Sequence, residues 1–177
     1  MIALGSQAPD FRLPDVVTGK TVSRDQAAGS KGMLAMFICR HCPFVKHVQD
    51  ELAAIGRDYA KSGVGIVAIS ANDAVTHPDD RPESLAEMSR ELRLTFPYLY
   101  DETQEVARAY DAQCTPDFFL YDGRGKLVYR GQLDDSRPGN GIPVTGKDLR
   151  GALDALIAGK PISPEQRPSI GCNIKWK

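Results

Sequence analysis

A continuous run of apolar residues, Met33–Ile38, ends directly at Cys39. Its length, with Gly32 before it and Pro43 soon after it, is typical of a strand that is buried on both faces. After Pro43 the apolar residues recur every three or four positions, as they do on one face of a helix. These residues are Val45, Val48, Leu52, Ile55 and Tyr59. Two cysteines, Cys39 and Cys42, therefore lie where a buried strand passes into an amphipathic helix.

The remainder of the chain alternates between predicted strands and predicted helices. Strands are predicted at 11–13, 21–22, 65–70, 98–100, 117–121 and 126–130, and helices over 82–92, 103–110 and 149–157. This alternation predicts an α/β fold, in which a central sheet is flanked by helices. The turn signal at 122–125 predicts a hairpin, which makes the sheet mixed. We expect one domain over 1–177, with an N-terminal extension at 1–31 and an irregular C-terminal tail at 161–177.

The charge and cysteine content narrow the class of function. The formal net charge is −1 and there is no basic block, so we expect no nucleic-acid partner and no membrane partner. No apolar run is long enough to cross a bilayer, and the N-terminus lacks the pattern of a signal peptide, so we expect a cytoplasmic protein. Four cysteines in 177 residues are too few for a disulfide scaffold. Paired cysteines in a reducing compartment instead indicate redox chemistry or metal binding.

The motif Cys39-Arg40-His41-Cys42 has the spacing of a redox-active dithiol. We expect Cys39 at the N-terminus of the helix, where unpaired backbone N–H groups and the helix dipole lower the pKa of a thiol. Arg40 and a protonated His41 add positive charge, which stabilises the thiolate and raises the reduction potential. Cys42 lies three residues on, so the two sulfurs can meet on one helical turn and close a disulfide. Half of a metal site and two structural cysteines are the other interpretations of this motif.

Five segments of the sequence carry a resemblance that covers nearly the whole chain. They are Ala8–Phe11, Cys39–His47, Phe96–Asp101, Cys114–Leu120 and Ser169–Lys177. Together they resemble the thioredoxin superfamily, and most closely a bacterial thioredoxin-family and peroxiredoxin-like branch of the AhpC/TSA type with a CxxC motif. The resemblance implies a thioredoxin-like fold with an N-terminal extension. It also implies that Pro116 is a cis-proline facing the dithiol, and that Thr115 presents its backbone to a substrate in a groove beside it.

The sequence departs from the superfamily patterns at the dithiol itself. Ile38 stands where thioredoxins usually carry tryptophan, and the preceding apolar run contains no acid. In the peroxiredoxin pattern Cys42 takes the peroxide-reactive position, but Cys39 replaces the threonine that orients peroxide and Ala35 replaces the proline. Thiol peroxidase activity, an antioxidant function, is therefore an alternative. Arg130 is the candidate for the arginine that assists peroxide reduction.

The other two cysteines lie in segments that carry the resemblance. Cys114 lies two residues before Pro116, and Cys172 lies in the C-terminal tail. Cys114 is either an additional redox thiol or a small buried apolar side chain, because free cysteine is often fully buried. Cys172 is either an additional redox thiol or part of a tail that docks by packing, with Trp176 as its anchor. Cys172 has two candidate partners, the dithiol and Cys114.

We therefore expect a thiol–disulfide oxidoreductase that cycles between the Cys39/Cys42 dithiol and its disulfide. Cys39 is the expected nucleophile, and Cys42 resolves the mixed disulfide. We expect no organic cofactor and no metal, because the dithiol itself carries the electrons. The expected partners are a protein or small-molecule disulfide, or a hydroperoxide, together with an external thiol reductant. The alternatives are a thiol peroxidase and a metal or iron–sulfur carrier that uses Cys39 and Cys42.

Overall fold

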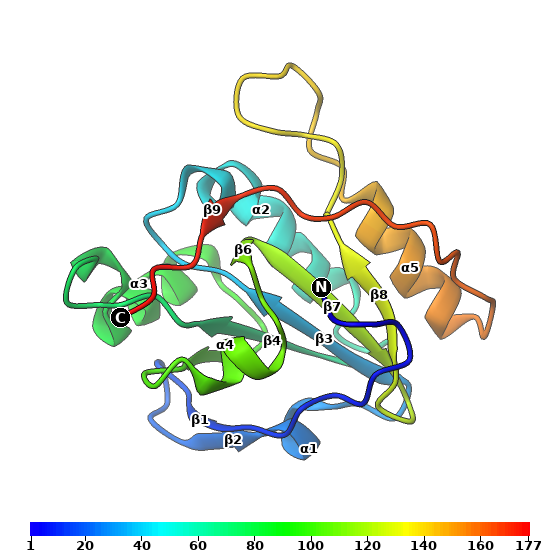
Figure 1. Ribbon diagram of the computed structural model, residues 1–177, viewed down its shortest axis with the longest axis horizontal. Helices are drawn as coiled ribbons and strands as arrows, with labels where there is room; N and C mark the ends of the chain where they lie inside the picture. The colour runs from blue at the N-terminus through cyan, green and yellow to red at the C-terminus, as the bar shows by residue number, and fades with distance from the viewer.

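A five-stranded sheet forms the centre of the fold in this computed structural model, which describes residues 1–177 (Figure 1). Its strands, in the order β5-β4-β3-β7-β8, are Tyr98–Tyr100, Val64–Ser70, Gly32–Phe37, Asp117–Asp122 and Leu127–Gly131. β3 pairs in parallel with β4 and antiparallel with β7, so the mixed sheet expected from the sequence is confirmed. Every residue of β3 is buried, as its continuous apolar sequence requires.

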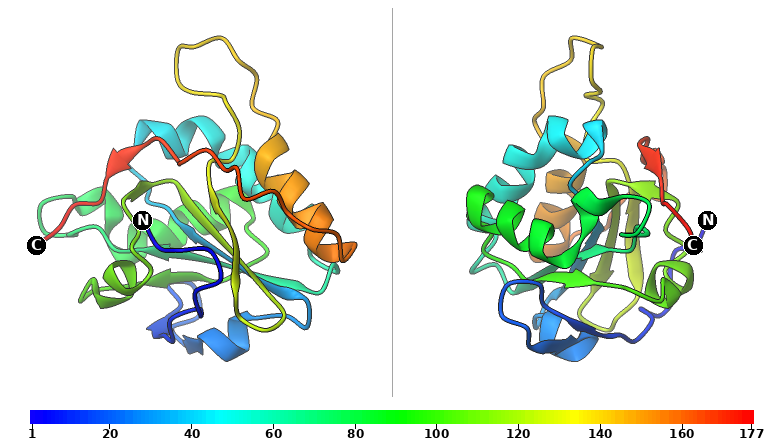
Figure 2. Two further views of the ribbon diagram at one scale, coloured as in Figure 1. Left: turned by 45° about the vertical axis from the view of Figure 1, so that its right-hand side comes forward. Right: turned by 90° about the vertical axis from the view of Figure 1, so that its left-hand side faces the viewer.

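Helices pack on both faces of the sheet (Figure 2). Three of them, α2 (Pro43–Asp58), α3 (Pro82–Leu92) and α5 (Lys147–Ile157), cover one face, and α1 (Arg24–Ala27) and α4 (Glu105–Ala109) cover the other. Side chains of a strand point alternately to its two faces, so β3 contributes to both hydrophobic clusters. Leu34 and Met36 pack with α2, α3 and α5, whereas Met33, Ala35 and Phe37 pack on the opposite side. None of these helices is both long and apolar enough to cross a membrane.

Residues 1–31 are an extension that precedes β3, the first strand of the central sheet in chain order. β1 (Arg12–Pro14) and β2 (Thr21–Ser23) pair antiparallel and lead into α1, whose start is stabilised by a capping box between Ser23 and Gln26. Phe11 is buried in the second hydrophobic cluster. The extension therefore completes the core on the face of the sheet that α4 covers only in part.

The segment that follows α5 crosses the molecule and reaches the end of the sheet where β3 passes into α2 (Figure 1, red). It is irregular except for β9 (Cys172–Asn173). β9 pairs antiparallel with β6 (Cys114–Thr115), the short strand that precedes β7. The chain's last residues therefore lie beside the segment around Pro116.

Candidate active site

The two cysteines lie at the carboxyl end of β3, in the loop before α2. Both Cys39 and Cys42 are 0% exposed. α2 begins at Pro43, so Cys42 is the N-terminal cap of the helix, which corrects the expectation that Cys39 occupies this position. The reason is Pro43, because proline suits the first helical position and holds the residue before it in an extended conformation.

Thr115, which lies in strand β6, contacts the sulfurs of both Cys39 and Cys42. Its hydroxyl lies 3.4 Å from the Cys39 sulfur, and its carbonyl oxygen lies 3.4 Å from the Cys42 sulfur. The Thr115-Pro116 peptide bond is cis, as the resemblance implied. One residue thus contacts both sulfurs and holds them at the same place on the sheet edge.

A buried carboxylate, Asp80, organises the loop that carries the dithiol. It is 0% exposed and ends the short 3₁₀ turn η1 (Pro78–Asp80). Its Oδ1 accepts hydrogen bonds from the backbone N–H groups of Arg40, at 2.7 Å, and of His41, at 3.2 Å. Its Oδ2 forms a hydrogen bond with Nδ1 of the His41 ring and accepts another, of 3.0 Å, from the Asn72 amide. The carboxylate therefore holds this loop through both its main chain and a side chain.

No local pattern in the sequence identifies Asp80. It lies in the polar segment 72–81, whose composition is typical of turns. Asp73 and Asp80 are both buried in that loop whereas Asp79 is exposed, and nothing local in the sequence distinguishes these acids. Only the position of the loop over the junction of β3 and α2 identifies Asp80.

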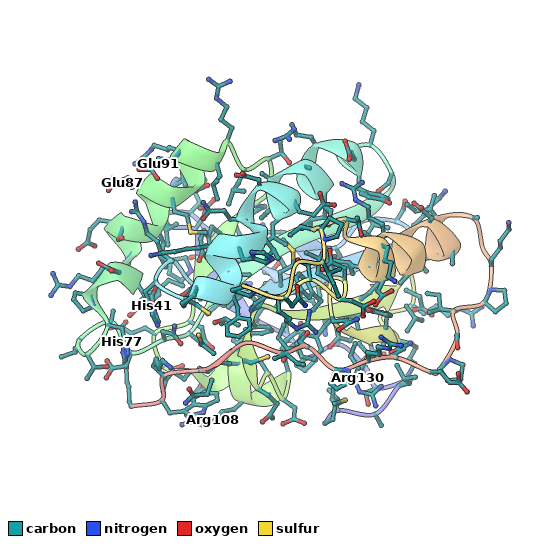
Figure 3. The ribbon with its side chains drawn as sticks, turned by 90° about the horizontal axis from the view of Figure 1, so that it is seen from above. His41, His77, Glu87, Glu91, Arg108 and Arg130 are labelled. Atoms are coloured by element: carbon teal, nitrogen blue, oxygen red, sulfur yellow. The ribbon has the colours of Figure 1, made fainter.

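His41 lies between Asp80 and the dithiol. The sulfur of Cys39, a ring nitrogen of His41 and a carboxylate oxygen of Asp80 lie within 4.8 Å of one another. These are donor types that metals accept, but His41 and Asp80 are already bonded to each other. Figure 3 shows His41 near the start of α2 with His77 beside it, and the two ring centroids are 4.9 Å apart. We therefore interpret the cluster as a hydrogen-bond network around Cys39.

Arg40 points away from the sulfurs and toward α3. Its guanidinium donates a hydrogen bond of 2.7 Å to the Ser84 carbonyl. It also forms ion pairs with Glu87 and Glu91, each at 3.4 Å, and both acids lie along α3 in Figure 3. These carboxylates offset much of the Arg40 charge, so its effect on the dithiol is weaker than the sequence suggests.

The two thiols of the dithiol have opposite pKa shifts. The hydrogen bond between their sulfurs is the main cause, and it lowers the pKa of Cys42 to about 4 while raising that of Cys39. Burial and the negative charge of Asp80 raise the pKa of Cys39 further, and the Val45 N–H stabilises the Cys42 thiolate. These directions are opposite to the lowered Cys39 pKa expected from the sequence, first because of the hydrogen bond between the two sulfurs and then because the carboxylate of Asp80 lies near Cys39.

A titration of the reduced protein checks this distribution of charge. We expect one equivalent of thiolate to persist from neutral pH down to a midpoint of about 4, the pKa of Cys42, when followed by ultraviolet absorbance. Cys42→Ser should remove this step, and Cys114→Ser should leave it in place. The assignment fails if no thiolate appears until the pH approaches about 8.5, the ordinary pKa of cysteine.

Cys172 and Cys114 project from opposite faces of the β6–β9 ladder. Cys172 is directly opposite Thr115, so both side chains point toward the dithiol. The Cys172 thiol interacts with the Cys42 sulfur and helps to lower the pKa of Cys42. Burial, followed by this interaction, raises the pKa of Cys172 itself to about 11. Cys114 is opposite Asn173 and points the other way, so the register brings Cys172 to the dithiol rather than to Cys114.

Cys114 belongs to a separate cavity. This cavity has a volume of about 200 Å³, and Asp117 and Arg130 also line it. Burial raises the pKa of Cys114 to about 12. Arg130 lies far from His41 in Figure 3, so it is not placed to assist chemistry at the dithiol.

Comparison with known proteins agrees with this architecture. Residues 4–130, more than half of the chain, match the model of the AhpC/TSA family. The chain belongs to this family. Thiol-disulfide oxidoreductase ResA of Geobacillus thermodenitrificans (strain NG80-2) is 33% identical over 129 residues, which span 71% of this chain and 67% of that protein. "Putative peroxiredoxin MT2597" of Mycobacterium tuberculosis is 32% identical over 109 residues, which span 61% of this chain and 63% of that protein.

A solved structure extends the comparison to the tail. The crystal structure of a conserved protein from Geobacillus kaustophilus is similar to this AhpC/TSA-family protein, with 57% identity and a TM-score of 0.98. The match covers 100% of this chain and 94% of the other, so it includes the C-terminal segment. The fold is thioredoxin-like, and the protein is a thioredoxin-like redox enzyme.

Proposed function

We propose that this AhpC/TSA-family protein is a thiol–disulfide oxidoreductase that cycles between a Cys39/Cys42 dithiol and its disulfide. The observation that supports this most strongly is the contact of both sulfurs with Thr115, each at 3.4 Å. Two thiols held against one residue, at the junction of a strand and a helix, can form and break a bond without moving the fold. The relative named as a thiol-disulfide oxidoreductase supports the same chemistry.

In the proposed cycle, the Cys42 thiolate attacks one sulfur of a substrate disulfide. This forms a mixed disulfide and releases the first substrate thiolate. Cys39 then loses its proton and attacks the Cys42 sulfur, which closes the Cys39–Cys42 disulfide and releases the second substrate thiol. An external thiol reductant reverses the process. The order of attack is opposite to the one expected from the sequence, because the cap position and the lowered pKa both belong to Cys42.

The His41–Asp80 pair is the proposed acceptor for the Cys39 proton. Its ring nitrogen and carboxylate oxygen lie within 4.8 Å of the Cys39 sulfur. Thioredoxins carry a buried acid in the strand before the dithiol, and this chain has none there. Asp80 supplies a buried carboxylate from a different element, the 3₁₀ turn before α3.

A thiol peroxidase is the second candidate. The lowered pKa of Cys42 supports it, because Cys42 takes the peroxide-reactive position of the peroxiredoxin pattern and a thiolate is the form that attacks peroxide. Cys39 stands where that pattern has threonine, and its sulfur, not a hydroxyl, faces Cys42. We therefore rank peroxide reduction below disulfide exchange.

Exposure of the reduced protein to two oxidants separates these functions. We expect a glutathione redox buffer to close Cys39 to Cys42 reversibly, as seen by peptide mass analysis after alkylation, and stoichiometric peroxide to react slowly. Rapid formation of a sulfenic acid on Cys42 would instead favour the peroxidase. If neither oxidant forms a reversible bond at Cys39, the proposed cycle is rejected.

A further inference from the structure

The C-terminal strand β9 occupies the sheet edge at the dithiol. It pairs with β6, whose Thr115 contacts both sulfurs. Gly171, just before β9, runs so close to the Thr115 carbonyl that a Cβ at this position would overlap it. A glycine is therefore required for the tail to pack against this backbone. An external peptide has no access to the same edge while β9 is in place.

Contacts on both sides of Cys172 hold the tail in this position. Before β9, the Ser169 hydroxyl donates a hydrogen bond of 2.6 Å to the Gly131 carbonyl. After it, Ile174 is only 1% exposed within the hydrophobic cluster on the α4 side of the sheet. The Lys175 N–H then donates a hydrogen bond of 2.9 Å to the Asn72 side chain. The position of Cys172 opposite Thr115 is thus fixed by the tail as a whole.

The three neighbouring thiols differ in their exposure to solvent. Cys39 and Cys42 are 0% exposed, whereas Cys172 is half-buried and reaches solvent. A substrate disulfide that approaches from solvent meets Cys172 before it meets the dithiol. Cys172 also interacts with the sulfur of Cys42, the thiol that the proposed cycle uses for attack.

We propose that Cys172 is a third catalytic thiol, which carries disulfide exchange between solvent and the buried Cys39/Cys42 pair. This inference rests on the proposed oxidoreductase function. Cys172 gives up its proton to solvent and attacks an external disulfide, which forms a mixed disulfide and releases the first external thiolate. Cys42 attacks the Cys172 sulfur, forms a Cys42–Cys172 disulfide and releases the second. Cys39 then attacks Cys42, which closes the Cys39–Cys42 disulfide and returns Cys172 to the thiol.

The intermediate can be trapped in the Cys39→Ser variant. One equivalent of oxidised glutathione should yield an intramolecular Cys42–Cys172 disulfide and two equivalents of reduced glutathione, detected by peptide mass analysis after acid quenching and alkylation. The proposal is overturned by a lasting glutathione adduct on Cys42 with Cys172 still free. A disulfide between Cys172 residues of two chains would overturn it equally.

The rate of closure tests the role of Cys172 in the intact dithiol. With oxidised glutathione, Cys172→Ser should close the Cys39–Cys42 disulfide at least about 10-fold more slowly than the natural protein, because the tethered relay is lost. Gly171→Ala, which keeps the thiol but displaces the tail, should slow closure similarly. Cys114→Ser is the matched control and should close at the natural rate.

The same experiment separates failure of the inference from failure of the proposed function. If Cys172→Ser closes Cys39–Cys42 at the natural rate, the relay is rejected and the dithiol cycle stands. If no Cys39–Cys42 disulfide forms in the natural protein or in any variant, the dithiol cycle itself is rejected, and the relay with it.

Discussion

Cys42→Ser is expected to lower the rate of catalysed thiol–disulfide exchange by at least about 10³-fold, because it removes the thiolate that attacks the substrate. The helix cap and the lowered pKa at Cys42 are the grounds for this assignment. Exchange between a small synthetic disulfide and a thiol reductant, followed as released thiol, measures the effect. Cys39→Ser should also stop turnover, because Cys39 can no longer attack Cys42, so it should accumulate Cys42 in a disulfide with Cys172.

Comparison of Cys42→Ser with Cys39→Ser shows which of the two cysteines attacks first. Cys114→Ser is the control, because this thiol lies in a separate cavity and should be dispensable. If Cys42→Ser still forms a mixed disulfide through Cys39 while Cys42 stays reduced in Cys39→Ser, the order of attack is the one expected from the sequence. Our assignment of the nucleophile to Cys42 would then be wrong.

Asp80→Asn is expected to lower the free energy of unfolding by about 3 kcal/mol, because it disrupts a buried, charged hydrogen-bond network. The carboxylate accepts hydrogen bonds from the main chain at Arg40 and His41 and bonds the His41 ring, so the asparagine amide cannot satisfy every partner. Urea unfolding measures the loss. Asp79→Asn is the matched control, since Asp79 is exposed in the same turn, and it should change stability by less than about 0.5 kcal/mol.

The same variant should also shift the titration of the dithiol. A negative charge near a thiol favours its protonated, neutral form, so Asp80 raises the pKa of Cys39. Removing the charge should lower that pKa, and thiolate absorbance from Cys39 should then appear at lower pH than in the natural protein. A titration curve that is unchanged in Asp80→Asn would show that the carboxylate serves only the structure of the loop.

The hydrophobic pattern of the chain was sufficient to predict the framework around the dithiol. The apolar run before Cys39 and the three- and four-residue spacing after Pro43 predicted a buried strand followed by a helix, and these are β3 and α2. Such patterns are local, because a strand alternates between faces every residue and a helix repeats every few residues. The exact start of the helix depended on proline geometry, and this is why Cys42 rather than Cys39 is its cap.

The sequence by itself therefore determined the fold class, the mixed sheet, and a dithiol at the junction of a strand and a helix. Only the tertiary structure decided the chemical environment of that dithiol. The buried carboxylate of Asp80 comes from a loop 38 positions beyond Cys42, and Cys172 comes from the end of the chain. Burial and charge depend on which segments lie together in space, and no local pattern specifies these contacts. For the same reason the opposite pKa shifts of Cys39 and Cys42 follow from the packing of β6, β9 and η1 around them.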